Sequence, residues 1–232
     1  MNKVKFRDLQ MKKRIYRVLN LSTNILIILF LTGLAIYYFL TNNTNNRQYA
    51  SLGVIGFSLF PFVFELATKR ILPNTMYLFV NIYIIFAGVL GSALSFYTNF
   101  SWFDIVIHSF MGYFAGAVGL FVLCASKDEK KMNVWTIALF CLSFSLFVEG
   151  VWELFEFAVD LAFPTMEMQG VNFEGQAFPL VTDTMVDIFC NFCGAIVFAL
   201  HFLLAKLLYK NLGIESMRRE FYSYREIEEN LK

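Results

Sequence analysis

Long apolar segments separated by short polar ones dominate the sequence. Six of them lie at residues 18–40, 49–68, 75–97, 104–126, 133–160 and 181–208. A helix needs about 20 mostly apolar residues to cross the hydrocarbon core of a bilayer. The pattern therefore predicts an all-α fold, namely a polytopic membrane protein built as a bundle of six transmembrane helices.

The polar flanks divide the chain into three parts. Residues 1–17 hold seven basic side chains and one acidic one, so they are predicted to be a basic cytoplasmic amino-terminal segment, either a positively charged flank or an interfacial helix on anionic lipid. Residues 18–208 form the six-helix transmembrane domain, and residues 209–232 a charged cytoplasmic tail. The first apolar segment is too long for the core of a signal peptide, so we expect no cleavable leader.

The composition supports a membrane protein. The chain is 58% hydrophobic and only 16% charged, whereas a soluble domain carries roughly 25% charged residues. We therefore expect membrane lipids as its surroundings, no attached soluble domain and no nucleic-acid partner. The sequence does not indicate an oligomeric state.

The basic residues predict the orientation. Lys and Arg are enriched in cytoplasmic loops. With the amino terminus inside, 18 of the 19 basic residues fall on the cytoplasmic side, and only Arg47 lies outside. We therefore predict a multi-pass protein of the cell membrane with both termini in the cytoplasm.

The fifth apolar segment contains three acids within an otherwise hydrocarbon-compatible stretch. Glu149, Glu153 and Glu156 are spaced i, i+4, i+7, which places them on one face of a helix. An ionised carboxylate in lipid is costly, so such residues face a bundle interior and are functional candidates.

Two neighbouring segments bring further polar residues to the same depth. The fourth enters from outside with Asp104 and His108 four residues apart, and the sixth carries Asp183, Asp187 and Asn191 on one face. In the predicted topology all three helices meet in one layer below the extracytoplasmic surface. The sequence therefore predicts an acidic pocket there.

The charge of this pocket needs compensation, because no Lys or Arg lies nearby and closely spaced carboxylates cannot all ionise. Carboxylates with one imidazole suit a divalent cation such as Mg²⁺, Mn²⁺ or Zn²⁺. The candidate metal ligands are Asp104, His108, Glu153, Asp183 and Asp187, with Glu149 or Glu156 as general acid or base and Asn191 as a further polar member. The alternative is a protonated hydrogen-bond network that only locks the helices together.

Glycines and cysteines have structural interpretations. Gly112 and Gly116 form a G-x-x-x-G pair that allows close helix packing. Cys190 and Cys193 form a C-x-x-C within an apolar segment, without the βαβ context of a redox motif, so we interpret them as packing residues.

Three isolated polar residues have simple interpretations too. Glu65 is expected to pair with Lys69 one helical turn later. His201 is expected to be a hydrogen-bonded core residue on the inner half of the sixth span. Asp160 is expected to be solvated near the outer surface.

Several of these motifs resemble those of known bacterial membrane proteins. The resemblance covers roughly residues 75–200 and rests on Asp104-x3-His108-x3-Gly112, Glu153-Leu-Phe-Glu156 and Asp183-Thr-Met-Val-Asp187-Ile-Phe-Cys. In this order they resemble the YjdF-like family of inner-membrane proteins. The run Asp187-x3-Asn191-x2-Gly194-Ala195 also resembles the last motif of VanZ-like proteins, a group linked to teicoplanin resistance. The resemblance implies a fold and a residue set, but no reaction.

The chain departs from the YjdF-like pattern at three places. Ile105 follows the first aspartate, where a basic residue is usual. The loop before the Asp pair reads Gly175-Gln-Ala-Phe-Pro-Leu-Val-Thr in place of Gly-Thr-Gln-Gly-Asp, and Glu149 has no counterpart. If that loop contacts a ligand, the ligand differs here.

The sequence leaves three functions open. The first is a metal-dependent hydrolase or transferase acting on an envelope lipid or cell-wall precursor at the outer leaflet, with the loop at 163–180 as a lid. The second is a non-catalytic envelope protein that binds a lipid or partner, as the VanZ resemblance implies. The third is a cation- or proton-coupled transporter, against which stands the position of the acids near one surface instead of the midplane.

Overall fold

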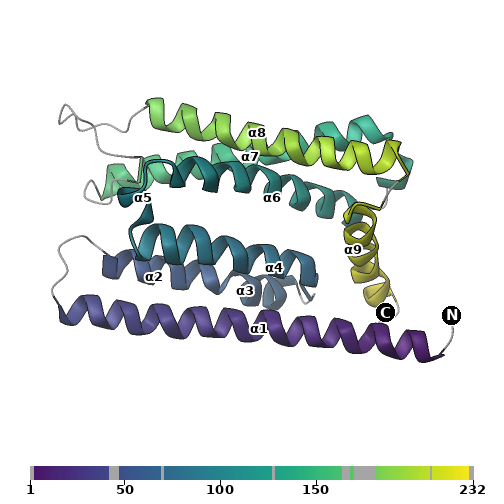
Figure 1. Ribbon diagram of the computed structural model, residues 1–232, viewed down its shortest axis with the longest axis horizontal. Helices are drawn as coiled ribbons and strands as arrows, with labels where there is room; N and C mark the ends of the chain where they lie inside the picture. Colours follow the sequence, from purple (N-terminus) through teal and green to yellow (C-terminus); the bar gives the residue numbers. More distant parts are fainter. Residues whose placement is uncertain are drawn as a thin grey trace. The chain divides into compact units, whose positions relative to one another are not determined.

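The computed structural model describes residues 3–41, 47–68, 71–126, 129–163, 168–169, 181–209 and 211–229, and for residues 3–13, 129 and 223–229 the backbone alone (Figure 1). Every regular element in these ranges is helical, which confirms the all-α fold. Six helical segments are long and apolar enough to cross a membrane: Arg14–Leu40, Arg47–Thr68, Asn74–Ala93, Phe103–Ala125, Val134–Ala162 and Val181–Leu207. The prediction of six spans is therefore confirmed.

The chain forms two compact units, residues 1–99 and 100–232. The first contains α1 (Lys3–Leu40), α2 (Arg47–Ser58), α3 (Phe60–Thr68), α4 (Asn74–Tyr83), the π-helix η1 (Ile84–Ala93) and α5 (Phe96–Asn99). Helix α1 is continuous from Lys3, so the basic segment and the first span are one helix. Ile27, Leu31, Val54 and Ile84 contribute to the hydrophobic core of this unit.

Two spans of the first unit are less regular than the sequence pattern suggests. The second span is interrupted at Leu59, between α2 and α3, because Pro61 has no N–H to donate to the preceding turn. The third span continues from α4 into η1 and ends at Ala93, before a turn in which Ser95 has a φ of 62°. The prediction that this span reaches residue 97 was therefore too long.

Buried and partly buried polar contacts connect the helices of the first unit. Arg17 Nη2 lies 2.5 Å from Glu65 Oε2, and Glu65 Oε1 accepts a hydrogen bond from the Leu72 backbone N–H at 2.8 Å. Glu65 therefore pairs with Arg17 on α1, a contact that helical spacing alone does not predict; Lys69, the expected partner, lies outside the described residues. Asn24 Nδ2 also donates to Asn81 Oδ1 at 3.1 Å.

The second unit consists of α6 (Phe103–Ala125), the 3₁₀ turn η2 (Glu129–Lys131), α7 (Val134–Ala162), α8 (Val181–Leu207) and α9 (Ile214–Glu229). Helices α6, α7 and α8 each contact the other two, and α9 packs on α6 and α8. Asn133 caps α7, since its side chain accepts a hydrogen bond from the Thr136 N–H at 2.8 Å. This three-helix group positions all the predicted site residues.

Glycines allow α6 to approach both neighbours. A Cβ on Gly112 would overlap the backbone of α8 at Asn191, and one on Gly116 would overlap the Phe198 ring. Gly119 faces α7 at Cys141. The predicted G-x-x-x-G contact surface is therefore present, and α8 is the helix packed against it.

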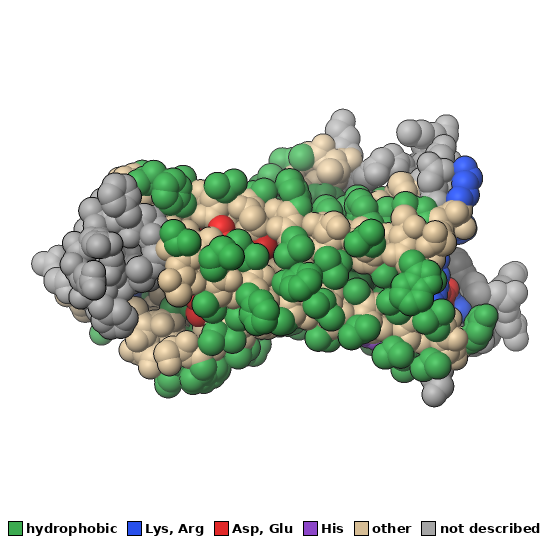
Figure 2. Space-filling view, turned by 90° about the horizontal axis from the view of Figure 1, so that it is seen from above, with side chains coloured by type: hydrophobic (Ala, Val, Ile, Leu, Met, Phe, Trp, Pro, Cys, Tyr) green, Lys and Arg blue, Asp and Glu red, His purple; other side chains and the backbone are tan. Residues whose placement is uncertain are grey.

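Helix α7 has a polar buried face and an apolar exposed one. Its buried residues are Ile137, Ala138, Cys141, Ser145, Glu149, Glu153 and Glu156, which recur every three or four positions. Leu139, Phe147, Val151 and Leu154 are exposed on the outside. The acids thus continue the packing face of the helix toward its end, while the hydrocarbon side chains face the surroundings. On the face shown in Figure 2, hydrophobic side chains are spread over the whole described surface, and acidic side chains are visible only as small patches.

Candidate functional site

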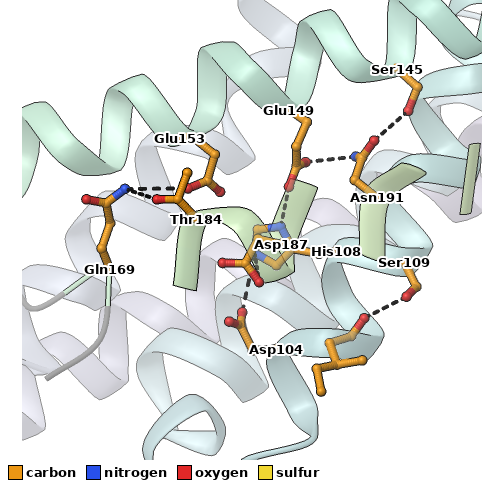
Figure 3. Close-up of polar contacts among 11 residues, drawn as sticks. Asp104, His108, Ser109, Ser145, Glu149, Glu153, Gln169, Thr184, Asp187 and Asn191 are labelled. Atoms are coloured by element: carbon orange, nitrogen blue, oxygen red, sulfur yellow. Dashed lines mark hydrogen bonds and ion pairs between the residues drawn. The ribbon is translucent and has the colours of Figure 1, made fainter. Parts of the chain in front are cut away.

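The centre of the site is His108 on α6, which is 6% exposed. Its Nδ1 lies 2.5 Å from Glu149 Oε1 on α7 (Figure 3). Its Nε2 lies 3.4 Å from Asp104 Oδ1 on the preceding turn of α6 and 3.9 Å from Asp187 Oδ1 on α8. The imidazole therefore has carboxylates at both nitrogens, supplied by three helices.

Glu149 is fully buried and both of its oxygens are engaged. Oε1 faces His108, and Oε2 accepts a hydrogen bond from Asn191 Nδ2 at 2.8 Å. The Ser145 hydroxyl lies 3.0 Å from Asn191 Oδ1 and 2.9 Å from the Gly112 carbonyl oxygen, both of them acceptors. A continuous polar chain thus runs from His108 to the backbone of α6 and fixes the Glu149 carboxylate.

Within the described part of the chain, two groups of side chains have donor atoms close enough to share a metal ion. Asp104, His108 and Asp187 form one, and His108, Glu149 and Glu153 form the other; within each, the donor atoms lie within 4.8 Å of one another. The first group therefore contains three of the five predicted metal ligands, with the two carboxylates near the Nε2 atom of His108. Glu153, the fourth predicted ligand, belongs to the second group.

Glu153 carries a buried oxygen that lacks a partner. The side chain is 5% exposed, and its Oε1 has no hydrogen-bond partner among the described residues, while Oε2 receives a long contact of 3.4 Å from Gln169 Nε2. Gln169 Oε1 is also buried and unpartnered. Two buried acceptors of this kind are costly unless a proton donor or a cation satisfies them.

Gln169 is a site residue that the sequence pattern did not indicate. Its Nε2 donates to Thr184 Oγ1 at 2.7 Å. Asp160 holds this segment, because its carboxylate accepts the backbone N–H groups of Met168 and Gln169 at 2.8 Å each. Asp160 is partly exposed, and in addition it has this structural role, which the sequence pattern did not indicate.

Asp183 and Glu156 lie at the edge of the cluster. Asp183 is half-exposed, one turn before Asp187, and belongs to neither group of metal-ligand geometry. Glu156 is buried on the same face of α7, but among the described residues it joins neither group and makes no hydrogen bond. The predicted set thus consists of a tight core and two peripheral acids.

The charge balance of the core is negative. Asp104, Glu149, Glu153 and Asp187 surround His108, and among the described residues of this cluster no Lys or Arg forms an ion pair with them. Even a fully protonated imidazole offsets one carboxylate. Shared protons or a bound cation must supply the remaining compensation.

The remaining sequence-level candidates have structural roles. His201 Nδ1 lies 2.7 Å from the Tyr113 hydroxyl, and His201 Nε2 lies 2.7 Å from the Leu212 carbonyl oxygen. The residue is hydrogen-bonded as expected, but its side chain is partly exposed and does not lie in the core. Cys190 is buried and Cys193 exposed, both as free thiols. The C-x-x-C is therefore not a disulfide in this structure.

Comparison with known proteins identifies the family. A family model described as "Predicted membrane protein (DUF2238)" matches residues 23–207, and the chain belongs to this family. The match includes most of the first apolar helix, the other five in full and the whole site. No curated protein and no solved structure matches the chain.

Proposed function

We propose that this protein binds a divalent metal ion between α6, α7 and α8, and uses it in a hydrolase or transferase reaction on an envelope lipid or cell-wall precursor. The observation that carries the proposal is the arrangement around His108. One ring nitrogen faces Asp104 and Asp187, and the other is held by the buried, doubly engaged Glu149.

The spacing of the donor atoms supports a metal ion. Ligands at about 2.0–2.2 Å from a common ion lie roughly 3.0–3.5 Å from one another. The distance from His108 Nε2 to Asp104 Oδ1 is 3.4 Å, and that to Asp187 Oδ1 is 3.9 Å. A small side-chain adjustment therefore places all three donors around one ion.

Glu149 fits the role of the residue that orients the histidine ligand. Metal-binding histidines usually donate the N–H of the other ring nitrogen to a carboxylate, which fixes the tautomer and the ring orientation. Glu149 Oε1 lies 2.5 Å from His108 Nδ1, and Asn191 holds the second oxygen. The role of general acid or base then belongs to Glu156, which is buried nearby and has no such engagement among the described residues.

The identity of the metal follows from the donor set. Two or three carboxylates and one imidazole suit Zn²⁺ or Mn²⁺, and Mg²⁺ if water completes the shell. When bound, such an ion polarises a phosphoryl or carbonyl oxygen of the substrate. Since the site lies among lipid-facing helices, an amphiphile with a polar head is the substrate class that reaches it most easily.

The site is proposed to face the extracytoplasmic side of the cell membrane, with both termini in the cytoplasm. This orientation rests on the distribution of Lys and Arg. The relationship to YjdF-like proteins likewise rests on the motifs around Asp104, Glu153 and Asp187. The orientation is testable by cysteine accessibility in intact cells and right-side-out vesicles.

The decisive experiment is the metal content of the purified full-length protein, measured by elemental mass spectrometry. Wild type is compared with the double variant Asp187→Asn, His108→Ala and with the matched control Glu156→Gln. The expected result is near-stoichiometric metal in wild type and in Glu156→Gln, and its loss in the double variant, with all three folded by size-exclusion chromatography.

The same preparations test the chemistry. Metal-loaded wild type and metal-loaded Glu156→Gln are incubated with envelope lipid extract, and the products are followed by mass spectrometry. Turnover by wild type alone supports an enzyme with Glu156 as its acid or base. Absence of metal from all preparations, in chelator-free buffers, would instead favour a protonated network and the non-catalytic alternative.

A further inference from the structure

A polar cavity lies at the end of α8 away from the acidic cluster, where the chain turns into α9. It has a volume of about 290 Å³ and is lined by Lys206, Tyr209, Asn211, Glu215 and Arg219, among others. Lys206 is 19 residues from Asp187 along α8, or about 28 Å at 1.5 Å per residue. The cavity is therefore separate from the acidic cluster.

The lining of this cavity has more positive than negative charge. Lys206 Nζ lies 3.1 Å from Glu215 Oε2, and Arg219 Nε lies 3.7 Å from Glu215 Oε1. The same carboxylate is engaged by Arg218 Nη1 at 2.7 Å. Three cations thus share one carboxylate, which cannot neutralise them all.

Arg219 is the group most available to a ligand. Its side chain is 78% exposed, and its long contact with Glu215 is not a hydrogen bond. Its guanidinium therefore keeps its donors for an incoming acceptor. Planar guanidinium groups and Lys ammonium groups are the usual binders of phosphate oxygens.

The connection between α8 and α9 holds these side chains in place. Leu212 and Gly213 have φ values of 38° and 84°, and the Leu212 carbonyl oxygen accepts a hydrogen bond from His201 Nε2 at 2.7 Å. Ile214 and Phe221 of α9 are fully buried. Helices α8 and α9, which line the cavity on its two sides, are therefore held in place.

Apolar side chains beside the cavity indicate where the ligand's remaining part would lie. Leu204, Leu207, Leu208 and Tyr209 are about half or more exposed on the last turns of α8 and just beyond it. A headgroup in the cavity would leave its acyl chains against this surface. Basic pockets at the ends of membrane spans are known to bind anionic lipid headgroups.

We propose that the cavity between α8 and α9 binds an anionic phosphate group, held by Lys206 and Arg219. The phosphate of a lipid headgroup and free inorganic phosphate share this chemistry. Their difference lies in the acyl chains, which only the lipid places on the leucines at the end of α8. The site does not depend on the proposed metal site.

The test is lipid binding to the purified full-length protein by native mass spectrometry in detergent. Phosphatidylglycerol, phosphatidylcholine and inorganic phosphate are titrated separately, and phosphate is also added as a competitor of phosphatidylglycerol. Arg219→Gln is expected to weaken binding of phosphatidylglycerol roughly fivefold, and Arg219→Lys to restore most of it. Arg14→Gln, which removes an exposed basic residue of α1, is the matched control.

Glu215→Gln tests the proposal in the opposite direction, because this variant is expected to bind the phosphate group more tightly. Removing the shared carboxylate releases the Lys206 ammonium from its contact with Glu215, so phosphate binding is expected to tighten. The measurement is made well below the melting temperature of this variant, so that α9 remains docked.

The outcomes separate the alternatives. If inorganic phosphate competes with phosphatidylglycerol, the site binds the phosphate group alone. If phosphate does not compete, the site binds a lipid headgroup. Either outcome supports the proposal. Equal loss in Arg14→Gln and Arg219→Gln would indicate general surface attraction and overturn it. Equal affinity for phosphatidylcholine and phosphatidylglycerol, or weaker binding in Glu215→Gln, would overturn it too.

Discussion

Gly112 on α6 and Gly194 on α8 occupy reciprocal positions at a contact between the two backbones. A Cβ on Gly112 would overlap the carbonyl oxygen of Asn191, and a Cβ on Gly194 would overlap that of Ser109. Both obstacles are backbone atoms, so only separation of the helices could relieve the overlap. The glycine pair thus sets the distance at which His108 faces the residues of α8.

Alanine at Gly112 is therefore expected to destabilise the second unit. Overpacking of a well-packed interface typically costs about 1–3 kcal/mol, and backbone overlap belongs at the upper end of this range. Gly116→Ala should cost less, because the obstacle there is the Phe198 ring, which can rotate. The measurement is the unfolding free energy in detergent by denaturant titration.

Gly150→Ala is the control for this series. Nothing lies within 4 Å of a Cβ at Gly150, and alanine favours helix over glycine by about 1 kcal/mol. Its stability should be unchanged or higher. Equal losses of unfolding free energy in Gly112→Ala and Gly150→Ala would contradict the conclusion that Gly112 lies at the contact between α6 and α8.

The Ser145 hydroxyl is expected to contribute to stability through the interhelical chain. It lies within hydrogen-bond distance of the Gly112 carbonyl oxygen and of Asn191 Oδ1, and it is fully buried. Ser145→Ala should cost about 1–2 kcal/mol, because buried acceptors lose their donor. Ser109→Ala removes a hydroxyl that bonds only within its own helix, to the Ile105 carbonyl, and should leave the unfolding free energy nearly unchanged.

The sequence predicted the six spans from the length of its apolar segments, and it predicted the shared face of the acids from helical periodicity. Helical spacing alone places Glu149, Glu153 and Glu156 on one face, and the structure buries all three on the packing face of α7. Ser145 continues the same spacing four residues earlier, so the pattern could have identified it. The irregularities in the second and third spans depend on local backbone geometry, which hydrophobicity does not report.

The sequence pattern could not predict contacts between distant segments of the chain. Gln169 reaches Glu153 and Thr184 only because Asp160 holds the backbone at Met168 and Gln169. Periodicity assigns a residue to a face, but not to a partner on another helix. For the same reason the helical pattern could not show that Glu149, one of two candidate bases, is held by His108 and Asn191 from two other helices.

Arg17 and Glu65 are expected to be energetically coupled. Their charged atoms lie 2.5 Å apart, at side-chain exposures of 22% and 20%, and hydrogen bonds between charged groups contribute about 1.5–3 kcal/mol when partly buried. In a double-mutant cycle, Arg17→Gln and Glu65→Gln should each destabilise, and the double variant should cost less than their sum. Arg14→Gln with Glu65→Gln is the control cycle, for which a coupling near zero is expected, since Arg14 is exposed.

His201 is expected to hold the turn between α8 and α9. The Leu212 carbonyl can only accept, so His201 Nε2 carries the proton and Nδ1 accepts from the Tyr113 hydroxyl in the neutral imidazole. His201→Ala should accelerate hydrogen exchange at residues 211–214, and Tyr113→Phe should do so to a smaller extent. Tyr38→Phe removes a hydroxyl that bonds to Ala93 in the first unit and should leave exchange in this turn unchanged.

Docking of α9 is expected to weaken in acid through Glu215. Burial alone would raise the pKa of Glu215, but the hydrogen bonds from Lys206 and Arg218 outweigh it and lower the pKa below its ordinary value of 4.5. A carboxyl with a lowered pKa in the folded state adds stability that is complete above its unfolded pKa. That contribution is lost as the pH falls below about 4.5 and through the lower folded value. Proteolysis of α9, measured from pH 7 to pH 3, should therefore accelerate at the acid end in wild type. In Glu215→Gln proteolysis should be faster at pH 7 and show less change with pH; an identical acid response in both proteins would assign the effect to another group.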